Sequence, residues 1–288
     1  MLEVPIDERE ARLSLEDARQ KPIMLKIAPV LGPLLVLIAP TVVGAQDVDA
    51  PRPEDTEIWS PAPPIVAPAS PDEPVAPPSD AIVLFDGTSL DQWVNSRDGT
   101  PASWVVADGV FSVDNDVGDI ETAQAFLDFQ LHLEWRVPAG VMGTGQARGN
   151  SGLFLSTAGS GYEVQILDAY ENETYVNGMA GSIYKQSIPL ANPARPPGEW
   201  QHYDVIWRTP RFDGDGSLLR PARVTVFFNG VVVQDSFELE GQTRWIGPPD
   251  YAEAHGATPI RLQAHGDPGP TVSFRNIWLR ELTAEAGE

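Results

Sequence analysis

The feature that most limits the fold is a hairpin signal in the C-terminal half of the chain. Residues 223–228 and 231–233 are runs rich in β-branched and aromatic side chains, and only Asn229 and Gly230 separate them. Asn-Gly suits a two-residue turn between antiparallel strands, because both residues tolerate the positive φ angles that such a turn requires. The pattern therefore predicts two neighbouring antiparallel strands.

Several more short strands are expected between residues 82 and 282. Runs of the same kind, split by Gly, Pro, Asn and Asp, lie at residues 110–113, 131–135, 153–155, 202–207, 260–263 and 272–279. No window shows a convincing helical period, whereas residues 127–133 alternate with period two. About a dozen strands in ~200 residues predict an all-β fold, a two-sheet jelly-roll sandwich in which one curved sheet supplies a concave binding face.

The N-terminal residues carry the signals of export. Lys26 precedes an apolar run over residues 27–43, and Val43-Gly-Ala45 is a small-residue cleavage pattern. Residues 1–45 are therefore predicted to be a signal segment that is cut after Ala45, which makes the product periplasmic or secreted. Because residues 1–23 are rich in charged side chains, translation is expected to begin at Met24. An uncleaved membrane anchor is the alternative.

The next segment has the composition of a linker. Residues 46–80 contain ten prolines among Ala, Ser, Asp and Glu, which predicts a disordered, extended linker biased towards polyproline II. The folded domain is then expected at residues 81–283, followed by a tail at residues 284–288.

Composition excludes several classes of function. The formal net charge is −22, and such a chain is repelled by nucleic acid and by anionic membranes. The chain has no cysteine, which removes disulfides, thiol nucleophiles and cysteine-ligated metals. No membrane partner is expected once the signal is cut, and the oligomeric state is left open.

One predicted strand, Gly161-Tyr-Glu-Val-Gln-Ile-Leu-Asp168, combines apolar and polar side chains. Glu163 and Gln165 lie two residues apart, so a strand projects both from one face. Asp168 follows at an odd offset and would point to the opposite face unless a β-bulge restores the parity. Three such oxygen-bearing groups in one strand indicate a cleft that handles carbohydrate.

Eight segments along the chain carry a family resemblance. They are Leu84-Phe-Asp-Gly-Thr-Ser-Leu90 with Trp93, Gly149-Asn-Ser-Gly-Leu-Phe154, Tyr162-Glu-Val-Gln-Ile-Leu-Asp168, Gly181-Ser-Ile-Tyr184, Pro197-Gly-Glu-Trp-Gln201, Phe228-Asn-Gly-Val231, Ile260-Arg-Leu-Gln263 with His265-Gly266, and Phe274-Arg-Asn-Ile-Trp278. In these motifs residues 82–282 resemble the 3-keto-disaccharide hydrolase domain family. The resemblance implies a concanavalin-like jelly roll, similar to family 16 glycoside hydrolases, and cleavage of glycosides oxidised to a ketone at C3.

The chain departs from the family pattern at three places, one of which is a loop over residues 266–270 that is longer than usual. Ala264 stands where relatives carry Asp before the His-Gly pair, and Asp235-Ser236 stands where they carry Asn-His. All three departures are expected to lie near the cleft, where they would affect the identity of the substrate.

The acidic strand is similar in spacing to the family 16 pattern Glu-x-Asp-x-x-Glu, here Glu163-x-Gln165-x-x-Asp168. Gln165 replaces the middle acid of the pattern, and Asp168 replaces the final Glu with a side chain that is shorter by one methylene group. A retaining mechanism needs two carboxyl groups about 5–5.5 Å apart, so a standard double displacement is not expected here.

A 3-keto sugar offers a different route, because the ketone acidifies the hydrogen on C2. One base can remove this proton, after which the C1 substituent departs by elimination. Glu163, with a pKa raised by partial burial, is the leading base, and His265 is the competing one. Lys185, Arg148 or a bound divalent cation such as Ca²⁺ could stabilise the enolate oxygen.

The remaining site residues are predicted from their types and places in the motifs. The catalytic candidates are Glu163, His265 and Asp168, and the substrate-binding candidates are Arg148, Asn150, Gln165, Tyr184, Lys185, Trp245, His255 and Gln263. Trp245 lies in a Gly-rich loop and is expected to stack on a sugar ring. Asp168 could instead satisfy its own turn, and Lys185 could extend towards solvent.

The sequence identifies no metal-ligand set, and residues 213–216 (Asp-Gly-Asp-Gly) are interpreted as a surface turn rather than a calcium loop. The leading interpretation is an exported enzyme that cleaves an oligosaccharide or other glycoside carrying a 3-keto group. A lectin-like module that binds on the same concave face without catalysis is the alternative, and an ordinary β-glucan hydrolase is a third.

Overall fold

The computed structural model describes residues 51–65 and 75–282. The predicted signal segment, the whole of the predicted tail, and residues 46–50 and 66–74 of the predicted linker lie outside these residues. The described part contains three 3-10 helices, η1 (Pro53–Thr56), η2 (Gly145–Ala147) and η3 (Val176–Gly178), and the strands β1 (Ile82–Phe85), β2 (Trp93–Asn95), β3 (Val105–Ala107), β4 (Val110–Ser112), β5 (Ile120–Thr122), β6 (Phe129–Arg136), β7 (Ser151–Phe154), β8 (Glu163–Ile166), β9 (Gln201–Arg208), β10 (Arg211–Phe212), β11 (Leu218–Arg220), β12 (Arg223–Phe228), β13 (Val231–Glu238), β14 (Arg261–Leu262) and β15 (Ser273–Glu281).

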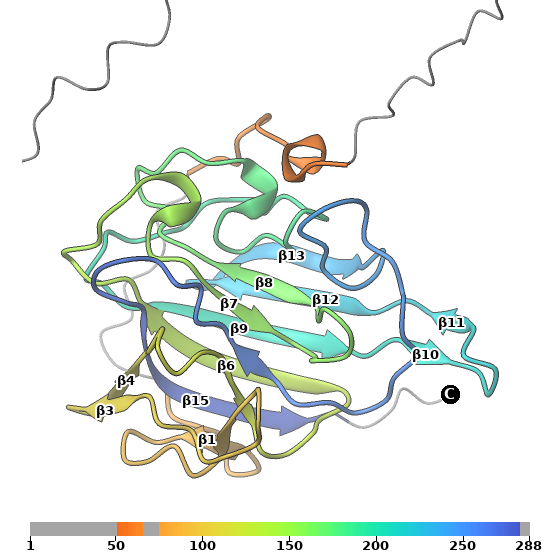
Figure 1. Ribbon diagram of the computed structural model, residues 1–288, viewed down its shortest axis with the longest axis horizontal. Helices are drawn as coiled ribbons and strands as arrows, with labels where there is room; N and C mark the ends of the chain where they lie inside the picture. Colours follow the sequence, from red (N-terminus) through yellow and green to blue (C-terminus); the bar gives the residue numbers. More distant parts are fainter. Residues whose placement is uncertain (1–50, 66–74, 283–288) are drawn as a thin grey trace, which may run out of the picture. The chain divides into compact units, whose positions relative to one another are not determined.

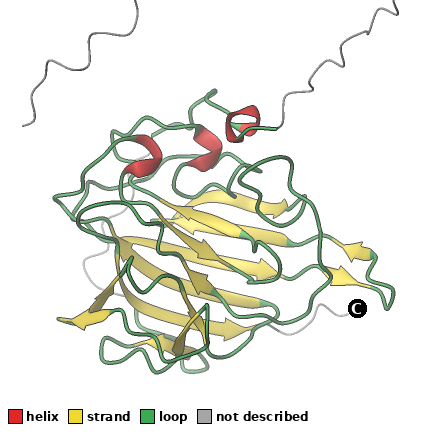
Figure 2. Ribbon diagram, in the orientation of Figure 1, coloured by secondary structure: helices red, strands yellow, loops and turns green. Residues whose placement is uncertain are grey.

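Two sheets form a sandwich, as the strand pattern predicts (Figures 1 and 2). The larger sheet has the order β13-β12-β9-β6-β15-β4-β3, with β1 paired to β15, and the smaller has the order β2-β5-β14-β7-β8. The hairpin β10–β11 projects to one side (Figure 1). The all-β prediction is confirmed, and every strand predicted from the sequence overlaps a strand of the structure.

The predicted hairpin is formed by β12 and β13, which pair antiparallel around Asn229 and Gly230. Both turn residues have positive φ, 51° and 79°. The Asn229 side chain also donates to the carbonyl of Pro193 and to Gln201 Oε1. Asn229 thus forms part of the turn and also links the turn, by hydrogen bonds, to Pro193 and Gln201.

The core lies between the sheets and is rich in aromatic rings, with Trp93, Trp135, Trp207, Phe111 and Phe274 fully buried. Apolar side chains of both sheets contribute to it, so the inner face of the smaller sheet is closed to ligand. Any binding surface on this sheet must use its outer face.

Strand β8 shows how the sequence divides its side chains between the two faces. Tyr162, Val164 and Ile166 belong to the hydrophobic core. Because successive side chains of a strand alternate, Glu163 and Gln165 point to the outer face, as their spacing predicts.

Residues 51–65 pack against the domain, unlike the extended linker expected over residues 46–80. The backbone N–H of Val176 donates to the Ile58 carbonyl at 2.6 Å, and the backbone N–H of Asn192 donates to the Pro64 carbonyl at 2.7 Å. Proline has no N–H, but its carbonyl still accepts hydrogen bonds, and loops of the domain supply the donors. The C-terminal end of the predicted linker also contacts the domain, because Arg280 Nη2 lies 2.6 Å from Asp80 Oδ2.

No helix within residues 51–65 and 75–282 has the length and apolarity needed to cross a bilayer.

Candidate active site

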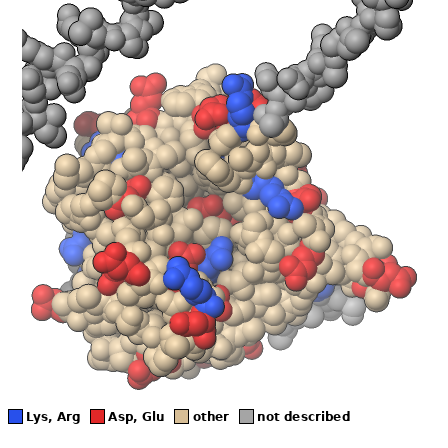
Figure 3. Space-filling view, viewed as in Figure 1, with Lys and Arg blue, Asp and Glu red and all other residues tan. Residues whose placement is uncertain are grey.

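A cavity of 510 Å³ lies over the outer face of the smaller sheet, within the size range of small-molecule sites. Strands β7, β8 and β14 supply its floor, and the loops around η2, η3 and residues 241–250 supply its walls. Its lining residues are Gln146, Asn150, Phe154, Ser160, Glu163, Gln165, Tyr175, Tyr184, Thr243, Trp245, Arg261, Gln263 and His265. On the face seen in Figure 3, acidic side chains are scattered and basic ones form a few separate groups.

Seven of the residues predicted from the sequence line this cavity: Asn150, Glu163, Gln165, Tyr184, Trp245, Gln263 and His265. Glu163 and His265, the two alternative bases, therefore share one pocket. Their chemical roles remain predictions.

Glu163 is 5% exposed at the floor of the pocket. Burial raises the pKa of its carboxyl group to about 8, although the positive charge of Arg261 opposes this rise. The Glu163 backbone amide donates to Thr243 Oγ1 at 3.0 Å, which fixes the start of β8. At neutral pH the carboxyl group is therefore mainly protonated and can donate a proton.

His265 is oriented by a carboxylate two residues further along the chain. Its Nδ1 lies 3.0 Å from Asp267 Oδ1. A carboxylate only accepts hydrogen bonds, so Nδ1 carries the hydrogen and Nε2 of the neutral ring is left as the acceptor. This is the arrangement that a general base requires.

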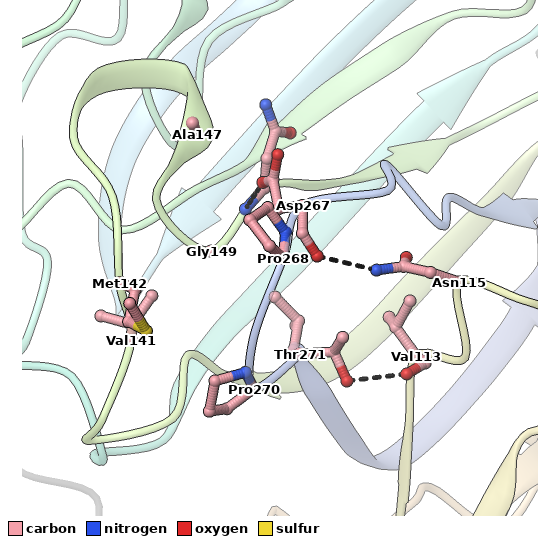
Figure 4. A pocket seen from close by; sticks show the side chains of 12 residues that line it. Val113, Asn115, Val141, Met142, Ala147, Gly149, Asp267, Pro268, Pro270 and Thr271 are labelled. Carbon is pink, nitrogen blue, oxygen red and sulfur yellow. Dashed lines mark hydrogen bonds between the residues drawn. The ribbon is translucent and has the colours of Figure 1, made fainter. Parts of the chain in front are cut away.

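Asp267 is itself held on two sides. The backbone N–H of Asn150 donates to its Oδ2 at 3.2 Å. Asn115 Nδ2 donates to its carbonyl at 2.9 Å, the contact drawn between the two labelled residues in Figure 4. The space around this contact measures only about 10 Å³, so the loop after His265 packs against the domain.

Arg261 brings a positive charge to the same pocket, and among its described lining residues it is the one Lys or Arg. The guanidinium lies 4.2 Å from the centre of the Phe154 ring, and Nε lies 3.6 Å from Asp119 Oδ2. These contacts hold the side chain over β7.

Several buried polar atoms of the lining have no hydrogen-bond partner in the protein. They are Asn150 Oδ1, Ser160 Oγ, Gln165 Oε1, Gln263 Oε1 and Arg261 Nε. Buried polar atoms without a partner are uncommon in native proteins. Amide and hydroxyl groups of this kind match the hydroxyl groups of a sugar.

Asp168 and Arg148 lie outside this pocket and pair with each other instead. Arg148 Nε is 2.8 Å from Asp168 Oδ2, and the Tyr170 amide donates to Asp168 Oδ1 at 3.0 Å. Burial raises the pKa of Asp168, and the Tyr170 amide and Arg148 oppose the rise. The pairing of β8 with β7 shows no register shift, and Asp168 stabilises its own turn through the Tyr170 amide.

Lys185 and His255 also lie away from the lining. Lys185 Nζ donates to the carbonyls of Pro53 and Trp245 at 2.7 and 2.9 Å. His255 Nε2 lies 2.9 Å from Tyr162 Oη, and its Nδ1 lies 2.9 Å from the Gly256 carbonyl. Both ring nitrogens of His255 are therefore occupied by contacts within the protein.

A family model described as the 3-keto-alpha-glucoside-1,2-lyase-like domain matches residues 80–280. The chain belongs to this family. The resemblance expected from the eight motifs is thereby confirmed. The family is carbohydrate-active and glycosyl-hydrolase-like, which agrees with a sugar-sized pocket lined by amides, carboxyl groups and aromatic rings.

Three relatives show how far the similarity extends. A 3-keto-disaccharide hydrolase from Bacteroides thetaiotaomicron is 27% identical over 243 residues, which are 70% of this chain and 78% of the relative. A solved structure of a candidate glycosyl hydrolase from Parabacteroides distasonis is 52% identical with a TM-score of 0.69, and the match covers 80% of this chain and 96% of that one. A second such structure from the same bacterium is 24% identical with a TM-score of 0.52, covers 70% and 94%, and shows a similar fold.

The departures at Ala264 and at Asp235-Ser236 do not line the pocket. The Ala264 amide donates to Asp119 Oδ1 at 2.8 Å, and its side chain packs against the core. The Ser236 amide donates to Thr225 Oγ1 on the exposed side of β13. Ala264 is nevertheless flanked by the lining residues Gln263 and His265, as expected for a residue near the cleft, whereas Ser236 lies on β13, which supplies no lining residue.

Six lining residues were not predicted: Gln146, Phe154, Ser160, Tyr175, Thr243 and Arg261. Arg261 could have been predicted from the sequence, because it lies two residues before Gln263 in a predicted strand and so its side chain points to the same face. The others reach the pocket from loops or from a neighbouring strand.

Within the described residues, no group of three or more His, Asp or Glu side chains is arranged to hold a metal ion. At residues 213–217, Asp213 Oδ1 accepts the amides of Asp215 and Ser217. This segment is a turn that satisfies its own backbone.

Proposed function

We propose that this protein cleaves 3-keto-glycosides by elimination across C1 and C2 of the oxidised sugar. The observation that carries the proposal is the presence, in the lining of one pocket, of a buried carboxyl group with a raised pKa and an imidazole oriented by a carboxylate. The family relationship supports the substrate class.

In the proposed reaction His265 Nε2 removes the proton from C2. The electron pair left on C2 forms the enolate of the C3 ketone, and then the C1–C2 double bond as the C1–O1 bond breaks. Glu163, protonated at pH 7 because its pKa is about 8, transfers its proton to the departing O1. The products are an unsaturated 3-keto sugar and the aglycone alcohol. Addition of water to the double bond gives net hydrolysis.

The sequence favoured Glu163 as the base, and the raised pKa instead suits it to the role of acid. A general acid should hold its proton at the working pH. His265 then takes the role of base. Proton transfer from His265 to Glu163 through solvent restores both groups after each turnover.

Arg261 is the proposed stabiliser of the enolate oxygen, in place of Lys185 and Arg148. Its charge lies on the pocket wall, whereas those two cations are bound to carbonyls and to Asp168. A positive charge aimed at a developing anion is often the largest single contribution to catalysis.

The proposal is tested with 4-nitrophenyl 3-keto-β-glucoside and its unoxidised parent. Release of nitrophenol from the oxidised compound alone, with exchange of the C2 hydrogen in deuterated water, is the expected result. Binding without release indicates a lectin-like module, and equal cleavage of both compounds indicates an ordinary glucan hydrolase.

His265→Ala is expected to lower kcat by about 10²–10⁴-fold, the usual contribution of a general base. Asp267→Asn should have a smaller effect, since the imidazole remains but its orientation and tautomer are less well fixed. The pH profile of kcat/KM, measured for both variants, checks the assignment. Wild-type rates in His265→Ala would contradict it.

Gly152→Ala is expected to disturb the pocket floor. A Cβ at this position would lie 2.7 Å from Glu163 Oε1 and 3.3 Å from Gln263 Oε1. A shift of about 1 Å in a catalytic group can cost about 10²-fold in rate, so kcat/KM should fall by that order while circular dichroism is unchanged. Gly140→Ala, where a Cβ meets nothing within 4 Å, is the matched control.

We also propose export, supported by the signal-like residues 1–45. N-terminal sequencing of the protein recovered from the periplasm or medium tests this proposal, and the expected first residue is Gln46.

A further inference from the structure

A short stretch of the N-terminal segment lies against two walls of the pocket. We call residues 53–59 the strap; it contains η1, which lies next to the loops above the smaller sheet in Figure 1. Pro53 accepts a hydrogen bond from Lys185 Nζ at 2.7 Å, and the same ammonium donates to the Trp245 carbonyl at 2.9 Å. Lys185 thus joins the strap to the tip of a pocket wall.

Lys185 occupies an unusual position for a charged residue. It is 8% exposed, and its backbone has a φ of 59°, in the left-handed region that side-chain-bearing residues rarely adopt. Burial lowers the pKa of its ammonium group, and Glu57 and Glu54 of the strap favour the charged form. Such unfavourable conformations persist where the surrounding contacts hold them, often at functional sites.

The strap also braces the opposite wall. The Trp59 ring meets the edge of the Tyr175 ring at 6.2 Å, and Ile58 exchanges hydrogen bonds with the backbone of Val176 and the side chain of Asn177. Tyr175 Oη lies 2.7 Å from Tyr184 Oη, and both tyrosines line the pocket. Movement of the strap would therefore shift this pair.

The Trp245 wall differs in depth from Glu163. Glu163 is buried at the floor, whereas Trp245 is 66% exposed. A ligand whose reacting ring reaches Glu163 must extend towards Trp245 with its remaining part. Aromatic faces suit stacking on a sugar or aryl ring.

We infer that the strap, Lys185 and the Trp245 loop together build a subsite for the aglycone, the second ring of the glycoside. Lys185 and Trp59 are positioning residues of this subsite. The inference rests on the proposed function, since it assumes that the reacting sugar occupies the floor.

Three variants of the full-length chain test it. Lys185→Met removes the ammonium that joins the strap to Trp245, Trp59→Ala removes the brace on Tyr175, and Trp59→Phe should restore most of that contact. Ile65→Ala is the control, because this side chain is 85% exposed and lies in the same segment outside the strap. Thermal unfolding of each variant verifies that it is folded.

Binding and turnover are measured for one-ring and two-ring ligands: methyl glucoside against a glucose disaccharide, and their 3-keto forms. Lys185→Met and Trp59→Ala should raise Kd and KM for the two-ring compounds about tenfold, equivalent to about 1.4 kcal/mol. The values for the methyl compounds and kcat should change less than twofold. Trp59→Phe and Ile65→Ala should resemble the wild type.

The outcomes separate the inference from the proposed function. If the wild type binds the ligands without releasing aglycone, the proposed function fails, and the Kd values still decide whether the subsite exists. If the wild type cleaves the substrates but both variants keep wild-type Kd and KM, the inference is wrong. Equal losses for one-ring and two-ring ligands, or no binding of either by the wild type, also overturn it.

Discussion

Glu163→Gln should lower kcat for a 3-keto-glucoside by about 10²–10⁴-fold, the range expected when a general acid is lost. Gln keeps the size and hydrogen-bonding shape of a protonated Glu, so substrate should still bind and KM should change little. The loss should be smaller for 4-nitrophenol than for an alkyl alcohol, because nitrophenolate departs without a proton. Steady-state kinetics with the two leaving groups measure this difference.

The matched control is Glu121→Gln. Glu121 belongs to β5 of the same sheet, pairs in register with Arg261, and is absent from the described pocket lining. This variant should retain near wild-type kcat. If both variants lose activity equally, the effect comes from the charge of the sheet and Glu163 is not the acid.

The parts of the site that lie on strands could be predicted, because a strand fixes the direction of each side chain. Glu163 and Gln165 follow from period two on β8, and the same rule relates Gln263 to Arg261 on β14. The hairpin at Asn229-Gly230 was equally accessible, since its turn depends on two adjacent residues. In all three cases local sequence determines local geometry.

The parts contributed by loops could not be predicted in the same way. Tyr175 and Gln146 reach the pocket through backbone paths that depend on tertiary contacts. Lys185 and Asp168 have side chains of types suited to catalysis, but both bind backbone groups instead. Lys185 donates to the carbonyl of Pro53, which is far away in the sequence, and Asp168 accepts the amide of Tyr170 in its own turn. Sequence alone does not show which buried backbone groups need a partner.

The segment at residues 51–65 departs from the composition rule for a related reason. Its prolines and small residues bury little apolar surface, which normally indicates a linker. Hydrogen bonds from Val176 and Asn192 to its carbonyls hold it on the domain. Those donors cannot be recognised from the composition of the segment.

Stability should depend on pH in a way that reports directly on Glu163. Its pKa is 4.5 as a free side chain and about 8 in the folded protein. Between these values the folded state binds more protons than the unfolded state, so the contribution of this group to the free energy of unfolding falls as pH rises, by about 1.4 kcal/mol per pH unit. Above pH 8 the loss is complete.

Glu163→Gln removes this ionisation and should therefore be more stable than the wild type at high pH. The difference in free energy of unfolding should be small at pH 4.5 and reach on the order of several kcal/mol by pH 8. Urea denaturation of both proteins at pH 5, 7 and 9 measures it, and subtraction cancels the contributions of His132 and Glu134, whose pKa values are also shifted. Parallel stability curves would mean that the carboxyl group titrates normally, and the assignment of Glu163 as a proton donor at neutral pH would then fail. A stabilised but inactive variant would instead indicate that the chain retains this buried acid at a cost in stability because the reaction needs its proton.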